Sequence, residues 1–129
     1  METKFNSQIC TTREQSGKLI ALGLKKETAD MVYEKSVTYP YEYELRILED
    51  GDYLCSGIIS DSIPAWSLHR LIEMMPNCIP NQGWLSLGHQ GLHYSKGYGV
   101  ADDGLYESII RMYEWLIKEG YFNKEYLED

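Results

Sequence analysis

The sequence is short of several features that would assign it to a class of protein. Positive charge is scarce: 12 Lys and Arg stand against 20 Asp and Glu in 129 residues, a net charge of −8. DNA, RNA and anionic membranes select basic surfaces, so sequence-independent binding to them is not expected. No apolar run approaches the roughly 18 residues of a transmembrane helix, and the N-terminus has no apolar signal-peptide core. We therefore expect a cytoplasmic protein whose partner is neither a membrane nor a nucleic acid.

Cysteine is also sparse. Cys10, Cys55 and Cys78 are an odd number without paired spacing, which is typical of reduced thiols. Of these, Cys78 is nearest in sequence to two histidines, His89 and His93, whose spacing suits a metal on a helix. This glycine-rich stretch is predicted to be a β-hairpin instead, and a two-residue loop puts the histidines on opposite faces, whereas a three-residue loop brings them together. We expect neither a metal nor another cofactor.

Catalytic motifs are missing as well. No serine lies in a Gly-x-Ser-x-Gly elbow, and the stretch from Gly97 to Gly99 lacks the later glycine and lysine of a phosphate-binding loop. His69 and Glu73 resemble an acid–base pair, but their spacing of four residues predicts a surface contact on a helix. No catalytic residue is predicted, although sites also assemble from residues distant in the sequence.

What the chain does have is aromatic side chains, with 11 Tyr and three Trp. Such residues fill cores and are also enriched at protein interfaces. Periodicity leaves three of them off the predicted core. Trp66 points away from the apolar stripe of its helix, Trp115 flanks a polar stripe, and Tyr53 falls on the outer face of a hairpin. We predict a partner surface that includes these three residues, with helix-end packing or cover by the N-terminal segment as the alternative.

The strongest secondary-structure signal is a helix over residues 105–120. Apolar residues recur along one side and charged residues along the other, and Gly120 lies where a left-handed residue ends a helix. Asp102 or Asp103 can cap its start. A second helix is predicted over residues 64–75, with Pro64 in its first turn and Asp61-Ser62 as the cap.

Each of these helices follows a predicted β-hairpin. Residues 41–47 alternate apolar and polar side chains, and Asp50-Gly51 is typical of a tight type I′ turn. The second hairpin turns at Gln90-Gly91 and pairs Leu87 with Tyr94. The two ββα units, 41–76 and 84–120, predict a four-stranded antiparallel sheet with two helices on one face. Their similar patterns reflect either an internal repeat or the demands of packing.

Residues 11–35 are predicted to form a helical hairpin, with its second helix over 26–34. DNA binding by a helix–turn–helix is disfavoured because Glu27, Asp30 and Glu34 would face phosphates. Together, the patterns predict a single α+β domain over residues 1–129: a helical hairpin followed by two ββα units.

Three segments carry a resemblance: ALGLKKETADM (21–31), IPAWSLHRLIEMMP (63–76) and EWLIKEGYFNKEYL (114–127). They resemble a family of short uncharacterised proteins encoded on prophages and mobile elements of anaerobic gut bacteria. The resemblance covers the predicted helices and not the hairpins, and it implies a cytoplasmic, phage-related protein without an established activity, cofactor or catalytic residue. We therefore expect a non-enzymatic protein-interaction or regulatory protein that pairs with a protein partner or itself, as a homodimer. The alternative is a small enzyme or ligand-binding protein with a pocket between sheet and helices.

Overall fold

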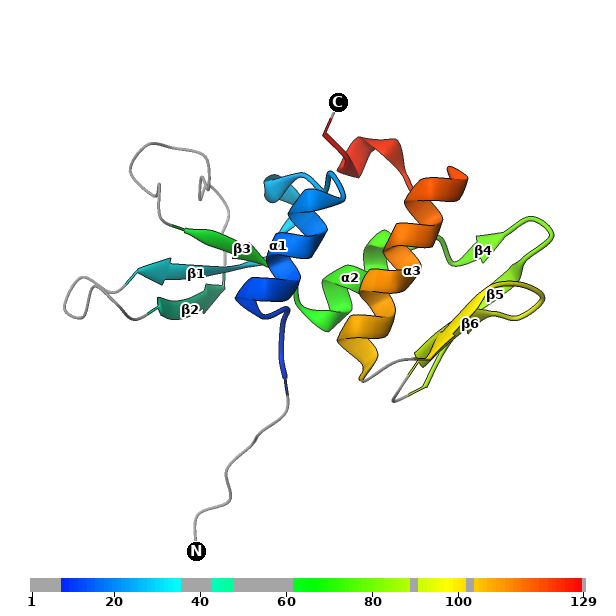
Figure 1. Ribbon diagram of the computed structural model, residues 1–129, viewed down its shortest axis with the longest axis horizontal. Coiled ribbons are helices and arrows are strands. Elements are labelled where there is room, and N and C mark those ends of the chain that lie inside the picture. The colour runs from blue at the N-terminus through cyan, green and yellow to red at the C-terminus, as the bar shows by residue number, and fades with distance from the viewer. Residues whose placement is uncertain (1–7, 36–42, 48–61, 89–90, 102–103, 129) are drawn as a thin grey trace, which may run out of the picture.

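The computed structural model describes residues 8–35, 43–47, 62–88, 91–101 and 104–128. These residues form an α+β fold in which three α-helices lie between two antiparallel sheets (Figure 1). In this part of the chain, no helix combines the length and the apolar character that crossing a bilayer requires.

The first sheet has three strands and is centred on β1, Met31–Lys35. On one side β1 pairs with β2, Tyr43–Ile47, and on the other with β3, Ile63–Ala65, both antiparallel. The predicted helical hairpin is therefore wrong in its second half. Helix α1, Arg13–Ala21, forms behind a Thr12 capping box, but only a single 3-10 turn, Lys26–Thr28 (η1), follows before the strand. The short apolar run from Met31 to Tyr33 fits a helix or a strand, and pairing with two distant segments selects the strand.

The predicted first ββα unit is also changed. Residues 43–47 form a strand as predicted, but their described partner is β1, with Leu45 opposite Tyr33. The predicted turn at Asp50-Gly51 lies outside the described residues. Pro64 belongs to β3, where an outer strand tolerates the missing N–H, and not to a helix. Helix α2, Leu68–Met74, begins later than predicted because Ser67 caps it, accepting a hydrogen bond from the Arg70 amide (3.2 Å).

The second sheet is a four-stranded meander. It consists of β4 (Cys78–Ile79), β5 (Gly83–Leu87), β6 (Gly91–Tyr94) and β7 (Gly99–Ala101), paired in that order. One four-stranded sheet shared by two hairpins was expected; instead, this sheet comes entirely from residues 78–101, and the strands before α2 belong to the other sheet.

The register of the second hairpin differs by two residues from the prediction. Leu87 is opposite Leu92, not Tyr94, because the Gly88 amide donates to the Gly91 carbonyl (2.8 Å) and closes the turn earlier. A shift of two residues keeps every side chain on its predicted face, since strand side chains alternate with a period of two.

Helix α3, Leu105–Glu119, is confirmed, and Gly120 ends it in the left-handed conformation (φ 80°). Its N-cap is Gly104, not Asp102 or Asp103. The helix packs against β6 and β7 on one side and against α1 on another. One continuous hydrophobic core joins these elements; its fully enclosed large side chains include Leu19, Trp66, Leu71, Tyr94, Ile109, Tyr113 and Leu116.

Candidate functional site

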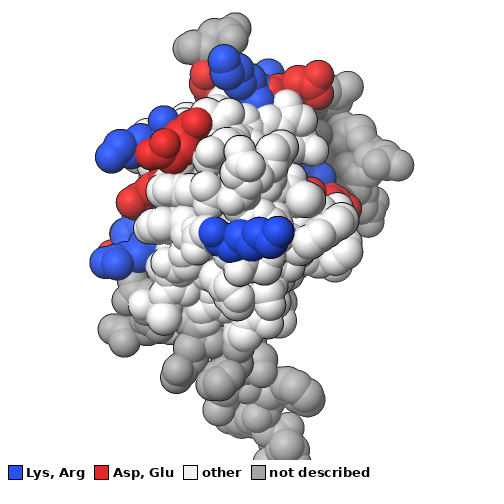
Figure 2. Space-filling view, turned by 90° about the vertical axis from the view of Figure 1, so that its right-hand side faces the viewer, with Lys and Arg blue, Asp and Glu red and all other residues white. Residues whose placement is uncertain are grey.

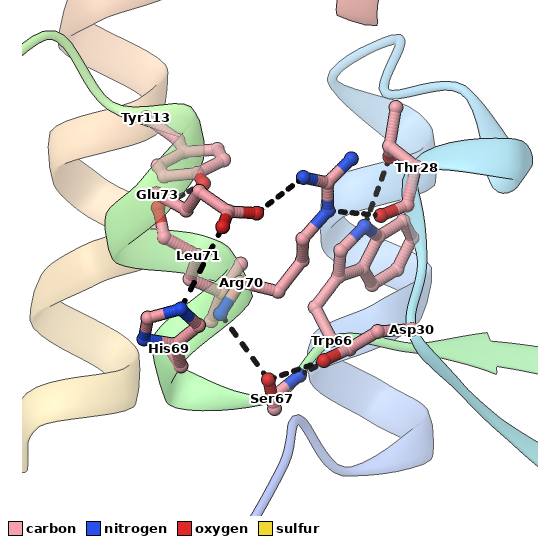
Figure 3. A network of polar contacts seen from close by, with 9 residues as sticks. All are labelled: Thr28, Asp30, Trp66, Ser67, His69, Arg70, Leu71, Glu73 and Tyr113. Carbon is pink, nitrogen blue, oxygen red and sulfur yellow. Dashed lines mark hydrogen bonds and ion pairs between the residues drawn. The ribbon is translucent and has the colours of Figure 1, made fainter. Parts of the chain in front are cut away.

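Trp66 is not part of a partner surface: its side chain is 0% exposed. The indole Nε1 donates to Thr28 Oγ1 (2.9 Å; Figure 3). The Trp66 amide donates to Thr11 Oγ1 (3.1 Å), so two distant segments hold the residue in place. The prediction failed because α2 begins at Leu68, which leaves Trp66 outside the helix whose faces were used to place it.

Beside Trp66, a network of polar contacts joins α2 to the start of β1 (Figure 3). Ser67 donates from its amide to Asp30 Oδ1 (2.8 Å) and from its hydroxyl to Asp30 Oδ2 (2.5 Å). The same hydroxyl accepts from the Arg70 amide, and Arg70 Nε donates to the Thr28 carbonyl (2.8 Å). A serine beside a carboxylate invites comparison with a nucleophile, but these bonds use the hydroxyl as a helix cap. The network therefore holds the start of α2 against Thr28 and Asp30.

The suspected acid–base pair on α2 is a surface contact, as predicted. His69 Nε2 lies 3.6 Å from Glu73 Oε2, and 88% of the His69 side chain is exposed. A hydrogen bond from Arg70 lowers the pKa of Glu73, with smaller contributions from the charges of Arg70 and His69. A general base needs a pKa near neutrality, and this carboxylate is shifted the other way.

Trp115 is half-buried, and three tyrosines surround it. Its ring stacks on Tyr98 (centroids 4.5 Å apart, planes 8° apart) and is tilted against Tyr94 and Tyr121. Trp115 therefore contributes an edge and not a free face to any partner. Tyr53, the third predicted surface residue, lies outside the described residues.

An open groove of about 620 Å³ follows the outer side of α3 past Trp115. Its lining residues carry charges of both signs, and Glu107 accepts from Lys18 Nζ (3.2 Å) and Gln15 Nε2 (2.9 Å). These contacts neutralise the carboxylate and hold α1 against α3. The groove is lined by Lys18, Tyr98, Glu107, Ile110, Arg111, Glu114, Trp115 and Lys118.

Trp84 is the most exposed aromatic side chain among the described residues, at 66%. On β5 the apolar Leu85 packs against the core, so Trp84 and Ser86 lie on the opposite, outer face of the sheet. Sequence reasoning overlooked this residue. The signal was available, because the alternation in Trp-Leu-Ser-Leu separates Trp84 from both leucines.

The outer face around Trp84 carries almost no charge. Residues 74–101 include a single Lys, Arg, Asp or Glu, which is Lys96, although such residues make up 25% of the chain. Figure 2 views the molecule from this side: uncharged residues fill the centre, one basic side chain crosses it, and most charges gather toward the margins. We call this surface the Trp84 face; its outward positions are Cys78, Trp84, Ser86, Gly91, His93, Gly99 and Ala101 on the strands and Ser95 directly after β6.

A shallow hollow of about 500 Å³ adjoins Trp84 along the strands. Six of its nine lining residues are outward positions on β5, β6 and β7 and their turn: Ser86, Gly88, Gly91, His93, Gly99 and Ala101. Small residues leave this space open. At Gly99 an added Cβ would lie 2.8 Å from His93 Cβ, so glycine is required for the close approach of the strands.

Within the described residues, no three His, Cys, Asp or Glu side chains form a group that could hold a metal ion. Cys10 is buried and Cys78 is exposed, both as free thiols. Comparisons of the chain with protein-family models, curated proteins and solved structures find no match. The family resemblance of residues 21–31, 63–76 and 114–127 therefore stays a prediction, and function is argued from this chain's own residues.

Proposed function

We propose that this chain is a non-enzymatic protein-interaction protein and that the Trp84 face is its contact surface. The observation that carries the proposal is Trp84 itself, a 66% exposed indole on a strand in the middle of an uncharged surface. Interface centres are depleted of charged residues and enriched in tryptophan, which often supplies a large share of the binding energy.

The energy available from covering this ring is substantial. A tryptophan buries about 150–250 Å² when fully enclosed. Two thirds of that area remains accessible at Trp84, roughly 100–165 Å². At about 25 cal/mol per Å², a partner that covers the indole gains roughly 3 kcal/mol from this residue alone.

The alternative, a small enzyme or ligand-binding protein, has less support. The groove along α3 is open, and its charges of both signs include the ion pair between Lys18 and Glu107. A ligand site usually combines an enclosed apolar pocket with a few converging polar groups. The hollow beside Trp84 is shallow and lined largely by glycine, serine and alanine, which suits a side chain from a protein partner. A regulatory role on a mobile element remains part of the proposal, resting on the resemblance of residues 21–31, 63–76 and 114–127.

Photo-crosslinking in the producing cell tests the contact surface. A benzoyl-phenylalanine introduced at Cys78, an exposed position opposite Trp84 and outside the hollow, is expected to capture a protein. The same probe at Glu14, exposed on α1, serves as the matched control and should capture far less. Trp84→Ala should abolish the Cys78 adduct. Absence of any adduct from Cys78, or adducts that persist unchanged in Trp84→Ala, would overturn the proposal.

A further inference from the structure

We infer that the protein held on the Trp84 face is a second copy of this chain, arranged about a twofold axis. This inference rests on the proposed function, because it names the occupant of the same surface. Two features of the face support it: the distribution of charge over the molecule and the shape of the face itself.

The lack of charge on this face allows a like-charged partner to bind there. Each copy carries a net charge of −8, so two copies repel each other wherever their carboxylates approach. Residues 74–101 contain no Asp or Glu and one basic residue, Lys96, so the described residues of the Trp84 face bring no carboxylate against a second copy. A basic partner, by contrast, would gain nothing from this face and would be drawn to the acidic remainder of the surface.

The shape of the face is self-complementary. Trp84 projects from β5, and the hollow lined by Ser86, His93, Gly99 and Ala101 begins one outward position further along the same strand. A twofold axis in the plane between two facing sheets, at a right angle to the line from the ring to the hollow and midway along it, puts each Trp84 into the hollow of the other copy. Such an interface is isologous, since the same residues contribute from both copies. The volume of about 500 Å³ is large enough for an indole ring.

The size of the face sets the strength of the contact. Four strands about 4.8 Å apart, the longest with five residues of about 3.3 Å each, make a platform of at most roughly 15 by 16 Å. Stable interfaces bury about 800 Å² per partner, which is more than this platform supplies. The dimer is therefore weak and reversible, with a dissociation constant of roughly 0.1 mM.

Sedimentation velocity on the purified chain, from about 5 µM to about 1 mM, brackets that value. The weight-average mass should rise from 14.9 kDa toward twice that value. Trp84→Ala should raise the dissociation constant roughly 30-fold or more. Ile47→Ala is the matched control: this side chain is 67% exposed, but on β2 of the other sheet, and the variant should dimerise like the parent chain.

A mixing experiment separates specific docking from general loss of apolar surface or of folding. Ala101→Phe fills the hollow and leaves Trp84 intact, whereas Trp84→Ala removes the ring and leaves the hollow intact. Each variant alone should stay monomeric. Mixed together, they should form a heterodimer, because one ring and one hollow remain to fit each other. If both variants are folded by circular dichroism and the mixture does not associate, the fit of Trp84 into the hollow of the other copy is overturned.

The homodimer and the contact surface can be refuted separately. A parent chain that stays monomeric at about 1 mM, together with a Trp84-dependent adduct of another protein at Cys78, overturns the homodimer and supports the contact surface. A monomer that also gives no adduct overturns both. A dimer that survives Trp84→Ala unchanged overturns the assignment of this face.

Discussion

Replacing Trp66 by Phe tests the burial of this residue, which was predicted to lie on the surface. Trp66 is 0% exposed, and its Nε1 donates to Thr28 Oγ1. The substitution removes that hydrogen bond, worth about 1 kcal/mol, and leaves a void where about three heavy atoms had packed. At about 0.8 kcal/mol per buried carbon, the void costs about 2 kcal/mol. We expect the free energy of unfolding to fall by about 2–3 kcal/mol.

Trp84→Phe is the matched control, because the same substitution at a 66% exposed ring leaves no void. Its effect on the unfolding free energy of the monomer should stay within about 0.5 kcal/mol. Both variants are measured by urea unfolding, followed by circular dichroism at low micromolar concentration so that fluorescence changes and dimerisation do not interfere. Equal costs for the two substitutions would refute the enclosure of Trp66.

A double-mutant cycle with Thr28→Val isolates the hydrogen bond. In the parent chain this change leaves the buried indole N–H without its acceptor, at a cost of about 1–3 kcal/mol. In the Trp66→Phe background no N–H is left to satisfy, so Thr28→Val should cost about 1 kcal/mol less. Additive effects would show that the two side chains do not interact.

Three further predictions concern other parts of the fold. Burial raises the pKa of Tyr94 to about 12, so its contribution to stability is full below an unfolded-state pKa of about 10 and is lost as pH rises toward 12. Between pH 9 and 11 the unfolding free energy should therefore fall about 1 kcal/mol less in Tyr94→Phe than in the parent chain, measured by urea titration. Gly120→Ala should cost about 1 kcal/mol because φ is 80° there, whereas Gly17→Ala, inside α1 with open space around it, should stabilise by a few tenths to about 1 kcal/mol in thermal melts. Added salt should tighten the dimer in sedimentation runs, since it screens repulsion between two copies of charge −8; weakening by salt would contradict an uncharged contact.

Local chemistry made α3 predictable. Its apolar stripe runs through 15 residues, and Gly120 supplies the left-handed end that the helix needs. The outward position of Trp84 was equally present in the sequence, because a strand sends alternate residues to opposite faces. The even shift in hairpin register did not disturb that alternation.

The second half of the predicted helical hairpin could not be decided locally. The apolar run from Met31 to Tyr33 is too short to distinguish a helix from a strand. Its partners, Ile47 and Ala65 opposite Met31, lie far along the chain, and only the folded structure brings them together. Once β1 exists, Asp30 faces Ser67, and the cap of α2 moves from the predicted Asp61-Ser62 to Ser67.

By itself, the sequence determined the helix that closes the fold, the alternation that turns Trp84 outward and the scarcity of charge around it. These follow from periodicity, glycine conformation and composition, which act within a few residues. Only the tertiary structure decided which tryptophan is enclosed and which is open. Trp66 is buried because Thr11 and Thr28, from segments distant in sequence, reach its amide and its indole N–H. Such contacts depend on how segments distant in the sequence pack together, and the periodicity of a short stretch does not show this.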